Sequence, residues 1–153
     1  MFLLIDTEQN NWFAVAVGEK DISRFKIVKK EFSQSELLLK TISRLLSPNG
    51  KSPNSIPRPE AIFVVQGPGA FSALRVGIAT ANALGFAWGA PVIGVKLKKE
   101  WQAMELKVKL KAIWETGVKA VDGQSRKIKR TEKIVIPVYG QSPNIGKKVV
   151  GSS

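Results

Sequence analysis

The first part of the chain alternates short apolar runs with polar breaks. Phe2–Ile5 ends at Asp6-Thr7, Trp12–Val17 ends at Gly18, and apolar residues alternate with charged ones over Arg24–Lys30. Runs of this length are typical of β-strands. The short breaks between them predict an antiparallel meander of three strands.

A leucine-rich stretch with helical spacing comes next. Ser33 and Glu36 stand three residues apart, which is the pattern of a capping box, and the pattern predicts a helix over Ser35–Leu46. Residues 47–59 hold four prolines and predict a loop. The helix has more apolar positions than one core-facing stripe requires, so its second side could contact a partner. These positions are Leu37, Leu38, Leu39, Ile42, Leu45 and Leu46.

A strand, a helix and another strand complete the regular pattern. The continuous apolar run Ile62–Val65 is typical of a buried parallel strand. A long helix is predicted over Phe71–Trp88, followed by a second buried strand at Val92–Val95. Such a unit has a right-handed crossover. The whole order predicts an α/β fold: one ribonuclease-H-like lobe with a mixed five-stranded sheet over residues 1–95.

The pattern changes after Val95. Lys96–Lys119 predicts a basic amphipathic helix, Val121–Lys133 a loop or disorder, and Ile134–Tyr139 a short strand or extended segment. Residues 140–153 lack core-forming residues. We therefore expect residues 96–153 to be a truncated second lobe, reduced to a basic helix and a C-terminal tail.

Small residues recur every four positions along the second predicted helix. They are Ala73, Gly77, Ala81, Gly85 and Gly89. Each interior glycine costs roughly 0.5–1 kcal/mol relative to alanine, so a close neighbour must offset the cost. That neighbour is either the sheet of the same domain or another helix. Leu74 and Ile78 form a larger apolar face beside this stripe.

The turn Gly67-Pro68-Gly69 stands between a buried strand and a helix. Backbone N–H groups at such a place can cradle a phosphate, but the spacing matches neither common phosphate-binding glycine motif. The simpler interpretation is a structural turn that needs unusual backbone angles.

Composition narrows the possible chemistry. The 153 residues contain no histidine and no cysteine, which excludes His- or Cys-based catalysis and ordinary zinc sites. Asp6 follows the first strand, where it is either a turn residue or a carboxylate near a nucleotide-bound metal.

No basic segment precedes the first apolar run, and Val76–Trp88 is shorter than the about 20 residues of a membrane span. We therefore expect a cytoplasmic protein.

Charge is distributed unevenly. The net charge is +12; residues 1–95 carry 10 Lys and Arg against 7 Asp and Glu, and residues 96–153 carry 14 against 5. Such asymmetry is typical either of nucleic-acid contact or of a solvated tail.

Several segments together resemble the TsaB (YeaZ) family. GPGAFSALRVGIATANAL at 67–84 is similar to the family motif G-P-G-S-F-T-G-L-R-[IV]-G-x-A-x-A-x-x-L. LLIDTE at 3–8, QSELLL at 34–39, VIGV at 92–95 and PVYGQSPNI at 137–145 match weaker motifs. Ala70, Ser72 and Ala73 depart from the central motif, as Glu8 and Gln34 depart from the others.

The resemblance implies an actin/sugar-kinase-type (ASKHA) lobe and a non-catalytic function. TsaB is the partner of TsaD in making threonylcarbamoyladenosine (t6A) on tRNA, and the resemblance implies no cofactor, no metal and no catalytic residue. Further implied partners are a TsaE-like ATPase and a second copy in a homodimer. The alternatives are a tRNA-binding module using the basic residues 96–153, and a residual ATPase or peptidase.

In TsaB the two helices carry the partner interface. Here they correspond to Ser35–Leu46 and Phe71–Trp88. The interface residues that we expect are Leu37, Leu38, Ile42, Leu45, Ala73, Leu74, Gly77, Ile78 and Ala81.

Overall fold

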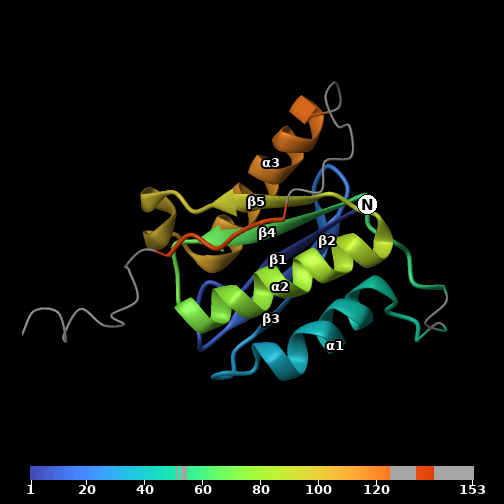
Figure 1. The fold of residues 1–153 in the computed structure, drawn as a ribbon, viewed down its shortest axis with the longest axis horizontal. Coiled ribbons are helices and arrows are strands. Elements are labelled where there is room, and N and C mark those ends of the chain that lie inside the picture. Colours follow the sequence, from blue (N-terminus) through green and yellow to red (C-terminus); the bar gives the residue numbers. More distant parts are fainter. Residues whose placement is uncertain (51, 53–54, 125–133, 140–153) are drawn as a thin grey trace, which may run out of the picture.

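A mixed five-stranded sheet in the order β3-β2-β1-β4-β5 organises the chain (Figure 1). The computed structural model describes residues 1–50, 52, 55–124 and 134–139. The strands are β1 (Phe2–Asp6), β2 (Phe13–Gly18), β3 (Ile22–Val28), β4 (Ala61–Gly67) and β5 (Val92–Lys96). The helices are α1 (Gln34–Leu46), α2 (Phe71–Trp88), the 3₁₀ helix η2 (Lys99–Ala103) and α3 (Leu106–Gln124).

The strand pairing confirms the predicted meander and the predicted βαβ unit. β1 pairs with β2, and β2 with β3, in antiparallel register. β1 pairs with β4, and β4 with β5, in parallel register. β1 and β4 therefore lie at the centre of the sheet, and Leu3, Leu4 and Ile5 are fully buried.

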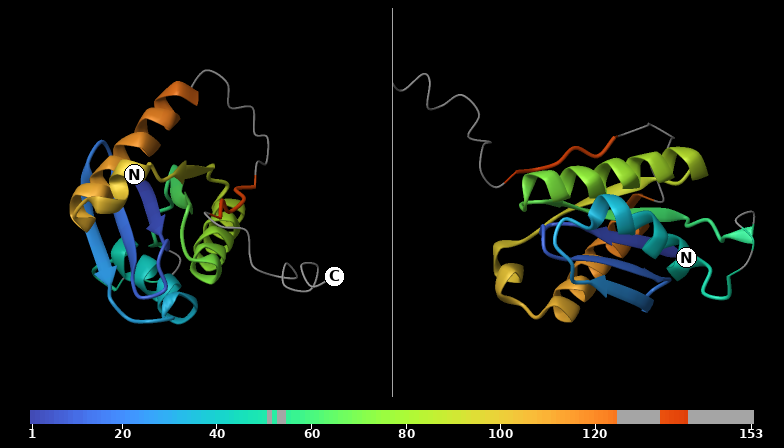
Figure 2. Two further views of the ribbon diagram at one scale, coloured as in Figure 1. Left: turned by 90° about the vertical axis from the view of Figure 1, so that its left-hand side faces the viewer. Right: turned by 90° about the horizontal axis from the view of Figure 1, so that it is seen from below.

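Helices cover both faces of the sheet. Figures 1 and 2 show α1 and α2 side by side on one face and α3 on the other. Successive side chains of a strand point to opposite faces, so neighbouring residues of β1 enter different clusters. Leu3 and Ile5 pack with α1 and α2, whereas Leu4 packs with α3.

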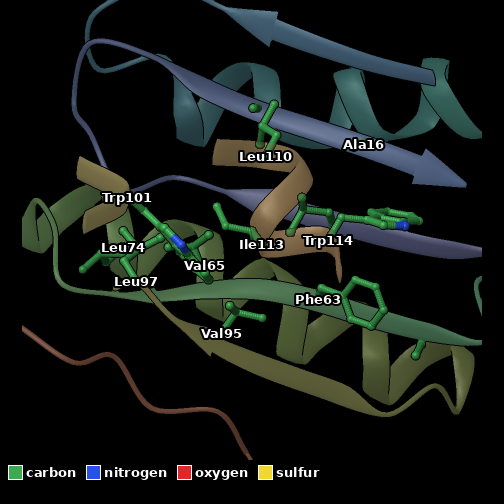
Figure 3. Packing of buried hydrophobic residues seen from close by; sticks show 13 residues of the cluster. Ala16, Phe63, Val65, Leu74, Val95, Leu97, Trp101, Leu110, Ile113 and Trp114 are labelled. Atoms are coloured by element: carbon green, nitrogen blue, oxygen red, sulfur yellow. The ribbon is translucent and has the colours of Figure 1, made fainter. Parts of the chain in front are cut away.

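Helix α3 contributes a large part of the core on its face of the sheet (Figure 3). Its Leu110, Ile113 and Trp114 are buried in the same cluster as Phe63 of β4. The Trp114 and Phe63 rings meet edge to face with centroids 5.5 Å apart, a favoured aromatic geometry. Packing therefore does not stop at residue 95: the region predicted as a remnant of a second lobe supplies one layer of this lobe.

The C-terminal elements differ from the expected ones. The helix predicted over Lys96–Lys119 is interrupted, because η2 ends at Ala103 and α3 begins only at Leu106. α3 then continues to Gln124, into the segment predicted as loop. Apolar residues continue unevenly from Trp101 to Trp114, so the sequence pattern does not indicate the break. Residues 125–133 and 140–153 of the predicted loop and tail lie outside the described residues.

The predicted capping box is wrong in its geometry. Ser33 makes no side-chain hydrogen bond to the helix backbone; its hydroxyl donates to the Lys30 carbonyl instead, at 2.8 Å. The Ser33 carbonyl accepts the first helical bond, from the Leu37 N–H. The position of the helix start is nevertheless close to the predicted one.

Among the described residues, no helix is both long enough and apolar enough to span a membrane.

Replacing Trp114 with alanine tests whether α3 belongs to the cooperative unit. Trp114 is 1% exposed, and removing a buried tryptophan costs about 3–5 kcal/mol. We expect Trp114→Ala to lower the free energy of unfolding by that amount in urea titrations. Val108 lies on the exposed side of α3, so Val108→Ala should change it little. Equal stability of both variants would show that α3 is not part of the unit.

Candidate functional site

Most of the residues predicted to contact a partner are buried inside the chain itself. Seven of them are buried: Leu38, Ile42, Ala73, Leu74, Gly77, Ile78 and Ala81. They face the sheet of their own domain, so a partner cannot reach them in this structure. Leu37 and Leu45 are half-buried. Contact of α1 and α2 with a partner stays a prediction, and of the residues named for it Leu37 and Leu45 are partly accessible.

The stripe of small residues faces the sheet, which decides between the two neighbours considered above. A Cβ added to Gly77 would lie 2.0 Å from the Thr7 Oγ1 atom at the end of β1. A Cβ on Gly85 would lie 2.4 Å from Val92 Cγ2 of β5. Gly89 differs, because it ends α2 with a left-handed φ of 66°, a conformation that favours glycine. Close helix–sheet packing therefore accounts for the stripe.

The outward sides of α1 and α2 form a second, exposed surface. We call it the helical face, defined by Leu39, Lys40, Ser43 and Arg44 of α1 and Ala79, Ala83, Phe86 and Ala87 of α2. Leu39 is 58% exposed and Phe86 is 86% exposed. Ala79, Ala83 and Ala87 also recur every four residues. This pattern is visible in the sequence, but the longer series of small residues from Ala73 to Gly89 drew attention away from it.

The Gly67-Pro68-Gly69 turn holds the start of α2 against the end of β1. The Gly67–Pro68 peptide is cis, and Gly67 has a φ of 120°. The Ala70 N–H donates to the Glu8 carbonyl at 2.7 Å, and a Cβ on Gly69 would lie 2.5 Å from that same oxygen. The close approach fits the structural interpretation of the turn.

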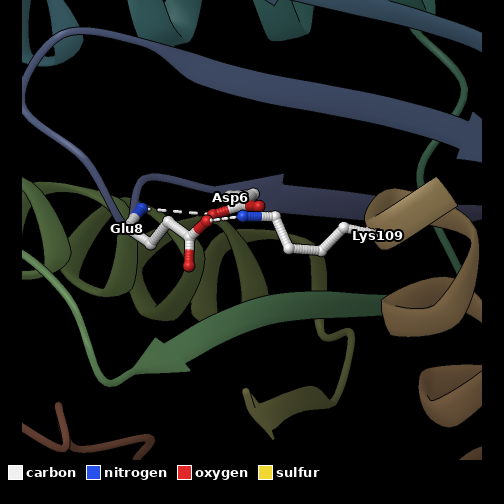
Figure 4. Close-up of polar contacts among 3 residues, drawn as sticks. All are labelled: Asp6, Glu8 and Lys109. Atoms are coloured by element: carbon white, nitrogen blue, oxygen red, sulfur yellow. Dashed lines mark hydrogen bonds and ion pairs between the residues drawn. The ribbon is translucent and has the colours of Figure 1, made fainter. Parts of the chain in front are cut away.

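A buried polar cluster lies beside this turn, where Lys109 of α3 reaches Asp6 and Glu8 (Figure 4). All three side chains are buried, and the Lys109 ammonium forms an ion pair with the Glu8 carboxylate. The Glu8 N–H donates to Asp6 Oδ1 at 3.1 Å. Within the part of the chain that the structure describes, Asp6 Oδ2 and the Thr7 hydroxyl have no hydrogen-bond partner. Lys109 was not predicted, because 101 residues separate it from Glu8.

Burial raises the pKa of the Asp6 carboxyl to about 8, and the neighbouring Glu8 carboxylate adds to the rise. The hydrogen bond from the Glu8 N–H and the Lys109 ammonium lower it in part. Asp6 is therefore largely neutral at pH 7, and one ammonium then balances one carboxylate. Among the described residues, no group of three acidic side chains is placed to hold a metal ion.

Basic residues of the C-terminal third are only partly described. Six lysines are exposed there: Lys96, Lys98, Lys99, Lys107, Lys111 and Lys119. Exposed Glu100, Glu105 and Glu115 stand among them, so this described surface carries both signs of charge. Contact with tRNA stays a prediction.

The fold defines the class of the protein. Three antiparallel strands, a helix and a parallel βαβ unit, with helices on both faces of the sheet, form a single ribonuclease-H-like lobe of the actin/sugar-kinase type. This confirms the fold expected from the sequence.

Comparison with known proteins identifies the family. The family model for TsaD, tRNA N6-adenosine threonylcarbamoyltransferase, matches residues 27–112, which is more than half of the chain. The chain belongs to this family. YeaZ from Pseudomonas aeruginosa has a similar structure, with a TM-score of 0.53 and 27% identity over 62% of this chain and 43% of that chain. The expected relation to TsaB (YeaZ) proteins is thereby confirmed.

Two further relatives agree with this assignment. A structure described as an uncharacterized protein with similarity to peptidase YeaZ, from Pseudomonas aeruginosa, has a TM-score of 0.53 and 27% identity over 62% of this chain and 42% of its own. The tRNA N6-adenosine threonylcarbamoyltransferase of Anaeromyxobacter dehalogenans is 36% identical over 58 residues. That alignment covers 38% of this chain and 16% of the transferase. The chain thus spans less than half the length of each relative.

Substituting Gly77 tests whether the small stripe serves the fold. An alanine there must displace Thr7, and overpacking of this kind costs about 1–3 kcal/mol. We expect Gly77→Ala to lower the free energy of unfolding by that amount. Gly123 of α3 is the matched control, since a Cβ there meets none of the described residues within 4 Å and alanine favours helix. A neutral Gly77→Ala would mean that α2 does not pack this closely.

The buried Asp6 carboxyl should make stability depend on pH. Because the pKa of Asp6 is raised from 3.8 to about 8 on folding, the folded state binds a proton that the unfolded chain loses within this range. Its contribution to stability is complete below pH 3.8 and is lost as pH rises to about 8. Asp6→Asn removes the titration, so its stability relative to the original chain should increase across this window. Urea titrations at several pH values measure the difference, with the exposed Asp122→Asn as control; a constant difference would contradict the raised pKa.

Proposed function

We propose that this chain is a non-catalytic partner of a TsaD-like protein in making t6A on tRNA. The helical face carries the proposal: two helices lie side by side on one side of the sheet and present Leu39 and Phe86 to solvent. Family membership indicates which protein class to test as the partner.

The chemistry of the helical face suits contact with other helices. Ala79, Ala83 and Ala87 are exposed and small, so a partner helix can approach the backbone of α2 closely. Lys40 and Arg44 are exposed on α1 and favour an acidic rim on the partner. The helical face thus has small residues at its centre and larger apolar and basic residues around them, which suits the binding of an amphipathic helix of the partner.

A scaffold function also agrees with the state of the acidic residues. Asp6 and Glu8 are buried, and Glu8 is paired with Lys109. A metal-assisted ATPase would need carboxylates accessible to nucleotide and metal. The chain also has neither histidine nor cysteine to serve as a base or nucleophile.

Ala83→Arg tests the proposed interface. An arginine at the centre of a packed helix interface would be buried without a partner, so binding to the TsaD-like protein of the same organism should weaken by more than about tenfold. Pull-down and titration calorimetry measure the change. Val108→Arg, on the exposed side of α3, is the matched control and should bind normally.

The same variants connect binding to function. In vitro formation of t6A on tRNA should increase when the original chain is added to the TsaD-like protein, and Ala83→Arg should abolish the increase. Full binding by Ala83→Arg would rule out this face, whereas failure of the original chain to bind would rule out the partner. Size-exclusion chromatography of the original chain detects a homodimer, and the same measurement on Ala83→Arg tests whether this face forms it.

A further inference from the structure

Residues 134–139, which we call the strap, lie along α2 although they are far from it in sequence (Figures 1 and 2). The strap has no regular secondary structure. It contacts Gln66 at the end of β4, Asn82 in the middle of α2 and Gly94 in β5. Residues of three elements of the lobe therefore hold one extended segment, and we call the surface that they form the groove.

The groove holds the main chain of the strap. The Asn82 side chain makes two hydrogen bonds to Val135: its Nδ2 donates to the carbonyl at 3.0 Å, and its Oδ1 accepts from the N–H at 3.1 Å. Gln66 Nε2 donates to the Ile136 carbonyl at 2.6 Å. The Gln66 carbonyl accepts from the Val138 N–H at 2.7 Å. All four hydrogen bonds are therefore made to backbone groups of the strap and none to its side chains.

Two glycines provide the space for this contact. A Cβ on Gly67 would lie 2.0 Å from the Val138 carbonyl oxygen, and a Cβ on Gly94 would lie 2.9 Å from Val135 Cγ1. At the end of the strap, the Tyr139 ring lies 4.5 Å from the Phe71 ring, centroid to centroid. The groove therefore fits a small β-branched residue and, four positions later, an aromatic one.

Two side chains of the strap point away from the groove. Ile134 is 74% exposed and Ile136 is 68% exposed, whereas Val135, Pro137, Val138 and Tyr139 are half-buried. Backbone hydrogen bonds combined with contacts to some of the side chains are the way in which proteins bind extended peptides.

We propose that Gln66, Gly67, Asn82 and Gly94 form a peptide-binding groove, and that residues 134–139 of the same chain are its built-in ligand. The ligand class is an extended peptide with a small β-branched residue that bonds Asn82 through its main chain, a free N–H three residues later and an aromatic residue after that, as in Val135, Val138 and Tyr139. This inference does not rest on the proposed TsaD-like partner.

Peptide binding to the full chain tests the proposal. The double substitution Val135→Asp and Val138→Pro disables the strap. Val135→Asp replaces the apolar side chain that faces Gly94, and Val138→Pro removes the N–H that donates to the Gln66 carbonyl. A fluorescein-labelled peptide of residues 134–139 should bind this variant in anisotropy titrations, and should bind the original chain at least about tenfold more weakly because its groove is filled. Equal binding to both chains, or binding to neither, would overturn the proposal.

Variants of the peptide test which of its groups the groove recognises. Replacing the outward Ile134 and Ile136 with threonine should leave binding unchanged, whereas the Val138→Pro peptide should not bind. Loss of binding in the threonine peptide would show that the groove does not recognise the backbone.

A second measurement does not depend on a disabled strap. Asn82→Asp keeps the shape of the side chain but replaces the Nδ2 donor with an acceptor, so amide hydrogen exchange at Val135 and Val138 should accelerate at least about tenfold. Gln102→Glu, an exposed amide on η2, is the matched control and should not change this exchange. Unchanged exchange in Asn82→Asp would also overturn the proposal.

Discussion

The close packing of α2 on the end of β1 determines how the rest of this lobe is arranged. Gly77 leaves no room for a side chain against Thr7, and Gly69 leaves none against the Glu8 carbonyl. These contacts fix both the start and the middle of α2. One side of the helix is then fully used by the sheet, and its opposite side, with Ala79, Ala83 and Ala87, is presented to solvent.

The other face of the sheet depends on α3. Trp114 and Ile113 fill the space over Phe63, while Lys109 supplies the positive charge that the buried Glu8 requires. A buried ion pair contributes little net stability, but the loss of one partner is costly. The carboxyl end of β1 is therefore closed by the chain itself, and the working surface that we propose lies on the opposite side of the sheet.

The sequence predicted the strands, α1 and α2 well, because each has a clear period and a clear break. It did not predict the interruption at Met104-Glu105, since the apolar residues continue across it. Burial of Ala73 and Gly77 against the sheet could not be distinguished from contact with a second helix, because small residues suit both. The Glu8–Lys109 pair and the Asn82–Val135 bonds join residues distant in sequence, and no local pattern indicates them.

The central claim is that the helical face, rather than the α3 side of the sheet, binds a TsaD-like protein. Amide hydrogen exchange of the full chain with and without that protein measures this most directly. Binding through the helical face should slow exchange in α1 and α2 and leave α3 unchanged. Slower exchange in α3 with no change in α1 and α2 would contradict the account.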